Sequence, residues 1–474
     1  MGTVNLDLTK PLNGQGRFWI PDDTNKTSTG RLNYDPATGI EIEITSPLSA
    51  DAHAGHVEAY PIVHGQLING DSVTLVDAFV TSRHFGSGGD GPTTMRVNRA
   101  IFGIYTHEAD QMQAKSCSFS NIGLGQWLGV NGLSSNEVYA DGERVGLDIR
   151  YRSPAEIKIP ISKPAIDLSI KWGFSWRSRY EESNIELLPQ AFIVAKSECG
   201  CSVADFRKVV WEIQRLMSLL IGQVPLLQWV NVEPTVTGTK GSIQHPLLFA
   251  QRAQGKPQGS PASRPLLSYP EVREVFPVIV NNWFLQNEQA KLAAMVYLES
   301  LLMKSSSVNA GFLNMVHAVE AYHRSLGDEF YMDQTKFDAA IGEFSSKIPE
   351  AIQGDHRESL KNRLKYGNEY SMRRRLSHML ERIPETFRIR IAGETYSRFV
   401  QKVVATRNYF THWDVESKGD AFSDGKDILN ATQRLRCLFI ASILHDLGIA
   451  DQTVENSIKG HADFAFWLGQ RLTQ

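Results

Sequence analysis

The sequence has little cysteine, no long hydrophobic run and almost no net charge. Only four of the 474 residues are cysteine, and the closest pair, Cys199 and Cys201, lacks the second pair or nearby histidine that a zinc site needs. Because secreted small domains depend on disulfides, this composition predicts reduced thiols in an intracellular protein. Residues 438–444 form one of the longest apolar stretches, far short of the roughly 20 residues that span a bilayer. The first residues do not resemble a signal peptide, so we expect a soluble, cytoplasmic protein without membrane contact.

The formal net charge is −3, which gives no global sign of nucleic-acid binding. Any nucleic-acid site must therefore be a local basic patch. The chain is long enough for two to four domains at roughly 100–200 residues each. We find no internal repeat of fixed period and no coiled-coil pattern.

Residues 1–200 have the pattern of a β-rich domain. The segment 40–44, IEIEI, alternates isoleucine and glutamate, as expected of a half-buried strand. Short strands separated by turn residues predict a sandwich-like or barrel-like module. Further strands are expected at 73–80, 145–151, 155–159, 166–172 and 191–195.

The period changes at residue 202. Residues 202–222 have apolar side chains at helical spacing, with Ser202 placed to cap the start and Gly222 to end the helix. A strand-like run at 226–232 follows, and then a stretch rich in Gly, Ser and Pro that predicts a long loop or linker. We therefore expect a mixed α/β connecting region over 201–290.

Residues 291–474 are predicted to form an all-α bundle, which makes the whole chain an α+β multidomain protein. Repeated i, i+3, i+4 apolar stripes mark the helices. They are expected at 290–303, 309–326, 335–348, 356–366, 371–383, 395–413 and 426–449.

One charged residue interrupts an apolar stripe. Arg407 falls three residues after Val404 and seven after Val400, at a position that the pattern reserves for the core. A buried arginine is costly unless it is paired or lines a site. Asn408 and His412 follow it at i, i+4 spacing, so the amide could orient the imidazole. Arg407 and His412 lie roughly 140° apart on an ideal helix, so they would converge on one phosphate only at a distorted helix end or across a two-fold seam.

The segment R-N-Y-F-T-H, residues 407–412, resembles the R-x(4–6)-H motif of HEPN ribonucleases. The helices around it, 312–326 and 363–380, together with the β-rich start at 16–44, are similar to the ApeA family of bacterial anti-phage proteins. The resemblance touches both ends of the chain, and about 200–290 matches nothing that we can name.

This resemblance implies a metal-independent endoribonuclease of abortive infection that dimerises through its HEPN domain and needs no cofactor. In the family, His412 would transfer protons at the ribose 2′-hydroxyl, and Arg407 would stabilise charge on the phosphorane, leaving a 2′,3′-cyclic phosphate. Imidazole and guanidinium suit these roles, since one titrates near neutral pH and the other is always charged. The resemblance also implies RNA, including tRNA, as substrate. A phage-derived trigger would be sensed by the regulatory β-rich domain, 1–200.

Two further groups of residues are candidates. Glu320 lies inside the stripe of the 309–326 helix, where some HEPN enzymes have a functional acid, and pairing with a basic residue of the bundle is the alternative. Residues 351–410 hold thirteen Arg and Lys against six Asp and Glu. This excess predicts an RNA-contacting patch or a solvated helix face. Its candidate RNA-binding residues are Lys361, Arg363, Arg373, Arg374 and Arg375.

Other interpretations of the sequence remain open. Arg373 and His378 repeat the R-x4-H spacing, but within a basic run that lacks the surrounding apolar stripe. His445 and Asp446 look like the H-D pair of HD-type metal phosphohydrolases, although no lysine follows at the usual place. A non-catalytic HEPN bundle that binds RNA or a partner is a third possibility, and Arg407 could be a buried arginine paired with a carboxylate.

Overall fold

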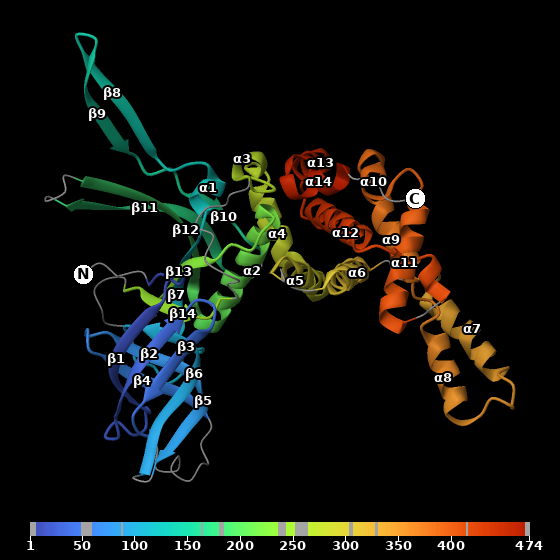
Figure 1. The fold of residues 1–474 in the computed structure, drawn as a ribbon, viewed down its shortest axis with the longest axis horizontal. Coiled ribbons are helices and arrows are strands. Elements are labelled where there is room, and N and C mark those ends of the chain that lie inside the picture. Colours follow the sequence, from blue (N-terminus) through green and yellow to red (C-terminus); the bar gives the residue numbers. More distant parts are fainter. Residues whose placement is uncertain are drawn as a thin grey trace. The chain divides into compact units, whose positions relative to one another are not determined.

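The computed structural model divides into two compact units, residues 1–284 and 285–474. The α+β multidomain organisation is confirmed: the first unit is rich in strands and the second is helical (Figure 1). The structure describes residues 6–48, 59–86, 89–162, 165–179, 184–235, 243–251, 264–302, 307–327, 330–413 and 416–469.

A closed barrel of six antiparallel strands forms the first part of unit one. The ring order is β6-β3-β2-β1-β4-β5, and β5 pairs back with β6. Ile40, Ile42 and Ile44 are buried while the intervening glutamates are exposed, as the alternation predicts. Closure leaves no open edge in the ring. The strands are β1 (Leu12–Trp19), β2 (Ser28–Asp35), β3 (Gly39–Ile44), β4 (Ala59–Leu67), β5 (Ser72–Gly86) and β6 (Gly89–Phe102).

An open sheet continues from the barrel in the order β10-β11-β12-β7-β13-β14, and β14 pairs with β6. The five residues of β14, all buried, lie where the sequence predicts a long loop, so that part of the loop prediction is wrong. A strand buried on both faces has no alternation to reveal it. The strands are β7 (Gln113–Asn121), β10 (Ile157–Ile159), β11 (Asp167–Arg179), β12 (Asn184–Ser202), β13 (Leu227–Pro234) and β14 (His245–Phe249).

Helix α2 (Val203–Ile221) covers one face of this open sheet and packs against β7 and β12. The Ser202 hydroxyl accepts a hydrogen bond from the Asp205 N–H, and Gly222 ends the helix with φ of 82°. Both predicted ends are therefore confirmed. Short helices α1 (Leu124–Leu128), α3 (Tyr269–Val272) and α4 (Phe276–Leu285) complete the unit, and the rings of Trp127, Tyr269 and Phe276 pack together.

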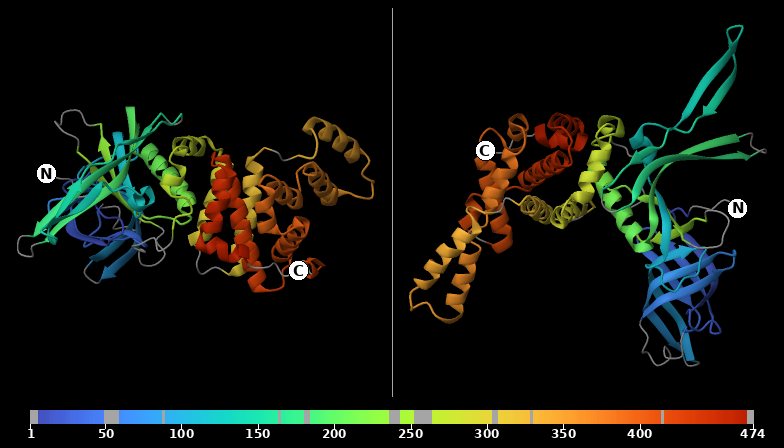
Figure 2. Two further views of the ribbon diagram at one scale, coloured as in Figure 1. Left: turned by 90° about the horizontal axis from the view of Figure 1, so that it is seen from above. Right: turned by 180° about the vertical axis from the view of Figure 1, so that it is seen from behind.

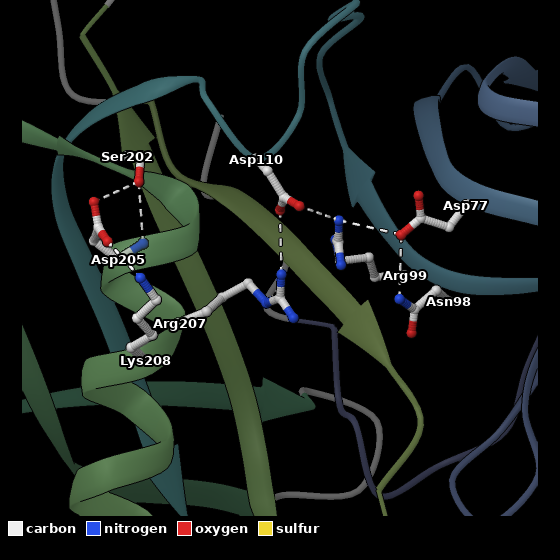
Figure 3. A network of polar contacts seen from close by, with 8 residues as sticks. All are labelled: Asp77, Asn98, Arg99, Asp110, Ser202, Asp205, Arg207 and Lys208. Carbon is white, nitrogen blue, oxygen red and sulfur yellow. Dashed lines mark hydrogen bonds and ion pairs between the residues drawn. The ribbon is translucent and has the colours of Figure 1, made fainter. Parts of the chain in front are cut away.

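An ionic network joins the barrel to helix α2 (Figure 3). Arg99 on β6, only 7% exposed, lies 2.5 Å from the Asp110 carboxylate and 3.4 Å from that of Asp77. Arg207 on α2 donates to the other oxygen of Asp110 at 3.2 Å. Asp77, within β5, has a left-handed backbone with φ of 54°. Asp110 thus binds one arginine from the barrel and one from helix α2.

The hairpin of β8 (Leu133–Ala140) and β9 (Glu143–Tyr151) stands apart from the rest of unit one (Figures 1 and 2). Every residue of β8 is exposed.

Unit two is a helical bundle built around α12 (Gly425–Asp446), most of whose residues are buried. The rings of Tyr297 and Phe439 stack at 4.9 Å, and Tyr322 packs edge-on against Phe439. Helices α7 (Gln334–Ser346) and α8 (Gly354–Lys365) bury no residue of their own and form a hairpin at the side of the bundle (Figure 1). The other helices are α5 (Glu288–Leu302), α6 (Val308–Ser325), α9 (Met372–Glu381), α10 (Glu385–Ala392), α11 (Tyr396–His412), α13 (Asp451–Gly460) and α14 (Ala462–Gly469).

Candidate active site

Helix α11 carries Arg407 at the edge of its buried stripe. Phe399, Val400 and Val403 are buried, whereas Arg407 is half-buried. Within the described parts of the chain, its guanidinium donates to the Asn408 side-chain oxygen at 3.2 Å. Its Nε is buried and has no partner among the residues that the structure describes. One donor of this charged side chain is therefore left without a described protein partner.

Other arginines of the bundle have protein partners, although Arg382 Nη1 and Arg436 Nε are also buried donors without a partner among the described residues. Arg382 donates to Asp446 at 2.6 Å, and Arg434 donates to the carbonyls of Arg390 and Ile391. Within the described parts of the chain, by contrast, Arg407 has no carboxylate partner. The structure therefore does not support the alternative in which Arg407 is a buried, carboxylate-paired arginine.

His412 is exposed and is the last residue of α11. Trp413, which follows it, has φ of 52° and ends the helix in the left-handed conformation, which is unusual for a bulky side chain. Among the described residues no hydrogen bond joins Asn408 to His412, and the Asn408 side-chain oxygen accepts from Arg407. The imidazole lies at the exposed end of the helix, next to the left-handed Trp413.

Aromatic side chains surround the end of α11. Phe410 packs edge-on against Phe312 of α6 with 6.4 Å between the ring centroids, which fixes the last turn to the bundle. Tyr409 contacts both Phe410 and Trp413, and Trp413 is 71% exposed. An exposed tryptophan beside a half-buried aromatic pair is typical of an interface anchor.

Glu320 lies on α6 and pairs with Arg324 at 3.4 Å. Arg324 also bonds Glu369 at 2.8 Å, and Glu369 accepts from the fully buried Arg375 at 3.3 Å. Glu320 therefore belongs to a network of charges between α6 and α9, the structural alternative noted above, and the structure shows no contact between Glu320 and Arg407.

The same network contains a histidine pair that the sequence did not reveal. Arg375 donates to His323 Nδ1 at 3.3 Å, which leaves His323 Nε2 as the donor to His378 Nδ1 at 2.9 Å. Both nitrogens of His323 are engaged. His378, from the second R-x4-H segment, is half-buried and bonded to His323, while Arg373 is exposed.

The candidate RNA-binding residues are not equivalent. Arg363 and Arg373 are exposed and make no ion pair with a described residue. Lys361 pairs with Glu358, and Arg374 pairs with Glu381 and lies over the Tyr370 ring. Arg375 is fully buried, so it is withdrawn from the RNA-binding set. The sequence already indicated this burial, because Arg375 lies four residues before the buried Met379 and therefore on the same face of the helix.

The H-D pair, His445 and Asp446, is used in two separate contacts. The two Asp446 oxygens accept from Tyr322 and from Arg382, both at 2.6 Å, while His445 bonds Asp451 at 2.7 Å. Within the described ranges, no three His, Cys, Asp or Glu side chains are grouped as metal ligands. Asp446 thus ties α12 to α6 and to the end of α9.

Comparison with protein families now identifies the chain. Residues 15–283 match the ApeA N-terminal domain 1, and residues 313–453 match the Apea-like HEPN domain. The chain belongs to the ApeA family. It is a HEPN-type protein of anti-phage defence, and HEPN domains commonly dimerise and act on RNA. No curated protein and no solved structure matched this ApeA-family chain. Its described helices include none long and apolar enough to cross a membrane.

Proposed function

We propose that this protein is a metal-independent endoribonuclease of bacterial abortive infection, with Arg407 and His412 as its catalytic pair. His412 moves the proton of the ribose 2′-hydroxyl as that oxygen attacks the adjacent phosphorus, and Arg407 binds the phosphorane oxygens. The P–O5′ bond breaks and the departing O5′ takes up the proton that the 2′-hydroxyl gave up, so the products carry a 2′,3′-cyclic phosphate and a 5′-hydroxyl. Asn408 has the supporting role of holding the Arg407 guanidinium.

The observation that carries this proposal is the state of Arg407. Its only hydrogen bond within the described residues is to the adjacent Asn408, and its buried Nε has no partner. Leaving a buried donor unsatisfied costs roughly 1–3 kcal/mol, which a bound phosphate would recover. His412 lies one turn further along at an exposed helix end, where an imidazole can exchange protons with solvent.

The active species in this proposal is a homodimer. Arg407 is half-buried and His412 exposed, five residues apart on one helix, so they are separated by roughly 140° around its axis. A two-fold axis beside the end of α11 would bring two copies of each residue into one groove. Phe410 and Trp413 would then bury part of the seam.

In this proposal, exposed arginine and lysine side chains at the surface of the helical unit contact the RNA. Arg363 and Arg373 are unpaired within the described chain, whereas Lys361 and Arg374 would first have to exchange their carboxylate partners. We propose structured RNA, including tRNA, as the substrate class. The β-rich unit then serves as the regulator that responds to a phage-derived trigger.

The test is cleavage of total RNA by the purified full-length protein. Arg407→Ala and His412→Ala should each lower the rate by at least about 100-fold, the size of a typical acid–base contribution. Arg407→Lys should retain only part of the wild-type cleavage rate, because an ammonium lacks the forked geometry of the guanidinium. His356→Ala, an exposed histidine on α8, is the matched control and should cleave normally.

Cleavage should persist in excess EDTA and leave cyclic-phosphate ends. Inhibition by chelator with rescue by Mn²⁺ would instead point to His445 and Asp446 and refute the mechanism. A folded wild-type protein that binds RNA without cutting it, with or without a phage lysate, would favour the non-catalytic alternative.

A further inference from the structure

An exposed aromatic segment of the helical unit lies where the chain enters helix α7. Three consecutive large side chains, Phe330, Tyr331 and Met332, are all exposed, and the Tyr331 residue is 56% exposed. Tyr366, which ends α8, is exposed as well. Single apolar side chains at a surface are common, but a run of large ones usually marks a binding site.

A buried asparagine fixes this segment in place. The Asn368 NH₂ group donates to the Met332 carbonyl at 2.9 Å and to the Gln334 side-chain oxygen at 3.0 Å. Its side-chain oxygen accepts from the Met332 N–H at 3.0 Å, and its carbonyl accepts from the Tyr331 N–H at 2.9 Å. The exposed side chains are therefore carried on an ordered backbone, so a ligand that binds them loses little affinity to backbone ordering.

The Tyr331 side chain is itself oriented by its neighbours. Its ring packs edge-on against that of Tyr370 with 4.9 Å between the centroids, and its hydroxyl lies 3.2 Å from that of Ser371, the N-cap of α9. Arg374 lies over the Tyr370 ring, 5.6 Å from its centroid. More than half of the Tyr331 surface remains available to a ligand in spite of these contacts.

The chain around Asn368 is basic. Residues 361–375 hold six Lys and Arg and one acidic residue, Glu369, which is already paired with two arginines. Arg363 in the last turn of α8 and Arg373 in the first turn of α9 are exposed and form no ion pair with a described residue. Exposed rings beside free cations match the bases and phosphates of a single-stranded nucleic acid. An apolar partner would leave the two arginines without counter-charge.

We propose that unpaired bases of RNA stack on Tyr331, with the neighbouring phosphates bound by Arg363 and Arg373. Double-stranded RNA keeps its bases inside the helix, so this surface selects a loop or a single-stranded end. The inference rests on the proposed function only in taking RNA as the ligand, because the binding requires neither Arg407 nor His412.

The aromatic segment and the proposed catalytic pair lie near opposite ends of α6. Arg324, close to the end of α6, bonds Glu369, whereas Phe312, close to its start, contacts Phe410 of α11. These two residues are twelve positions apart on α6, which is roughly 18 Å at 1.5 Å per residue. That distance equals about five nucleotides at roughly 3.4 Å each. One RNA strand can therefore contact Tyr331 and the end of α11 together.

Binding of an uncleavable RNA by the full-length protein tests this surface separately from the nuclease. The ligands are a fluorescent 2′-O-methyl oligoadenylate of about twelve nucleotides and its duplex with 2′-O-methyl oligouridylate, both measured by anisotropy. The wild type should bind the single strand at least about tenfold more tightly than the duplex. Tyr331→Ala should weaken single-strand binding at least about fivefold, which is the loss of one stacked base. The slope of log affinity against log salt should not change, since no charge is removed.

Two further substitutions at Tyr331 separate stacking from other contacts. Tyr331→Phe keeps the ring and should bind like the wild type, whereas Tyr331→Leu keeps only an apolar side chain and should bind like Tyr331→Ala. Tyr139→Ala is the matched control, because it removes a tyrosine that is 59% exposed from the β-rich unit, and it should bind like the wild type.

The proposal is overturned if Tyr331→Ala binds the single strand as tightly as Tyr139→Ala does, or if the wild type does not prefer the single strand. Wild-type affinity in Tyr331→Leu would also overturn it and would indicate an apolar protein partner. Tight single-strand binding that depends on Tyr331, in a protein that cleaves no RNA, would contradict the nuclease assignment and support this surface.

Discussion

Asp446 should stabilise the packing of α12 against α6 and the end of α9 and should not be a catalytic group. Its two oxygens accept one hydrogen bond each from Tyr322 and Arg382, at 2.6 Å, and its side chain is only 18% exposed. Asp446→Asn preserves the shape but removes the charge, and one of the two donors then faces an NH₂ group. Hydrogen bonds to charged groups contribute roughly 1.5–3 kcal/mol each. We therefore expect a loss of about 2–3 kcal/mol in the free energy of unfolding of the helical unit.

For a unit the size of residues 285–474, that loss corresponds to a fall of roughly 4–12 °C in its melting temperature. Scanning calorimetry of the full-length protein measures it as a shift of one transition. Tyr322→Phe removes one bond, keeps the carboxylate and should give a smaller fall, while both variants should cleave RNA normally when folded. An unchanged melting transition would contradict this structural role of Asp446. Loss of cleavage in folded Asp446→Asn would instead support the H-D interpretation.

The remaining predictions concern other parts of the chain. Asp110→Asn should lower the unfolding free energy of unit one by about 1–2 kcal/mol, since it weakens the bonds to two arginines, seen as a lower calorimetric transition. Burial lowers the pKa of His245, so the unfolded chain binds more protons below about pH 6.5; stability of unit one should fall on acidification, and His245→Asn should flatten that slope in melting curves. Trp413→Ala should weaken the dimer about 30-fold in sedimentation, and a wild-type monomer that cleaves RNA would exclude the composite site. Arg373→Ala should reduce the slope of log affinity for RNA against log salt by about 1, and an unchanged slope would remove Arg373 from the RNA path.

Local features of the fold were predictable because they depend on neighbouring residues. The alternation of residues 40–44 and the two ends of α2 follow from side-chain period and capping chemistry, and both are seen. Ring closure of the barrel was not predictable in this way. It depends on β5 pairing with both β4 and β6, which is a property of register and not of any one strand.

One row of polar side chains on the open sheet of unit one, formed by Lys196, Ser116 and Glu233, was missed for a related reason. The alternating serines at 116 and 118 are visible in the sequence, but Lys196 and Glu233 lie far along the chain on other strands. Only the strand order β12-β7-β13 brings these residues together. A period-two run of small polar residues marks a strand face that the core does not use, and such a run can be recognised from the amino-acid sequence alone.

Arg375 and Arg407 show why the apolar pattern alone cannot distinguish a structural arginine from the proposed catalytic one. Each lies in the apolar stripe of its helix, and α9 and α11 pack against each other. Arg375 is fully buried, and its guanidinium is satisfied by the Tyr370 carbonyl, His323 and Glu369, so a phosphate could reach it only by breaking those bonds. Arg407 has Asn408 alone within the described chain, and its helix ends five residues later at an exposed histidine. The guanidinium of Arg375 is therefore paired within the protein, whereas Arg407 keeps a buried nitrogen without a described partner, which favours Arg407 over Arg375 as the proposed anion-binding arginine.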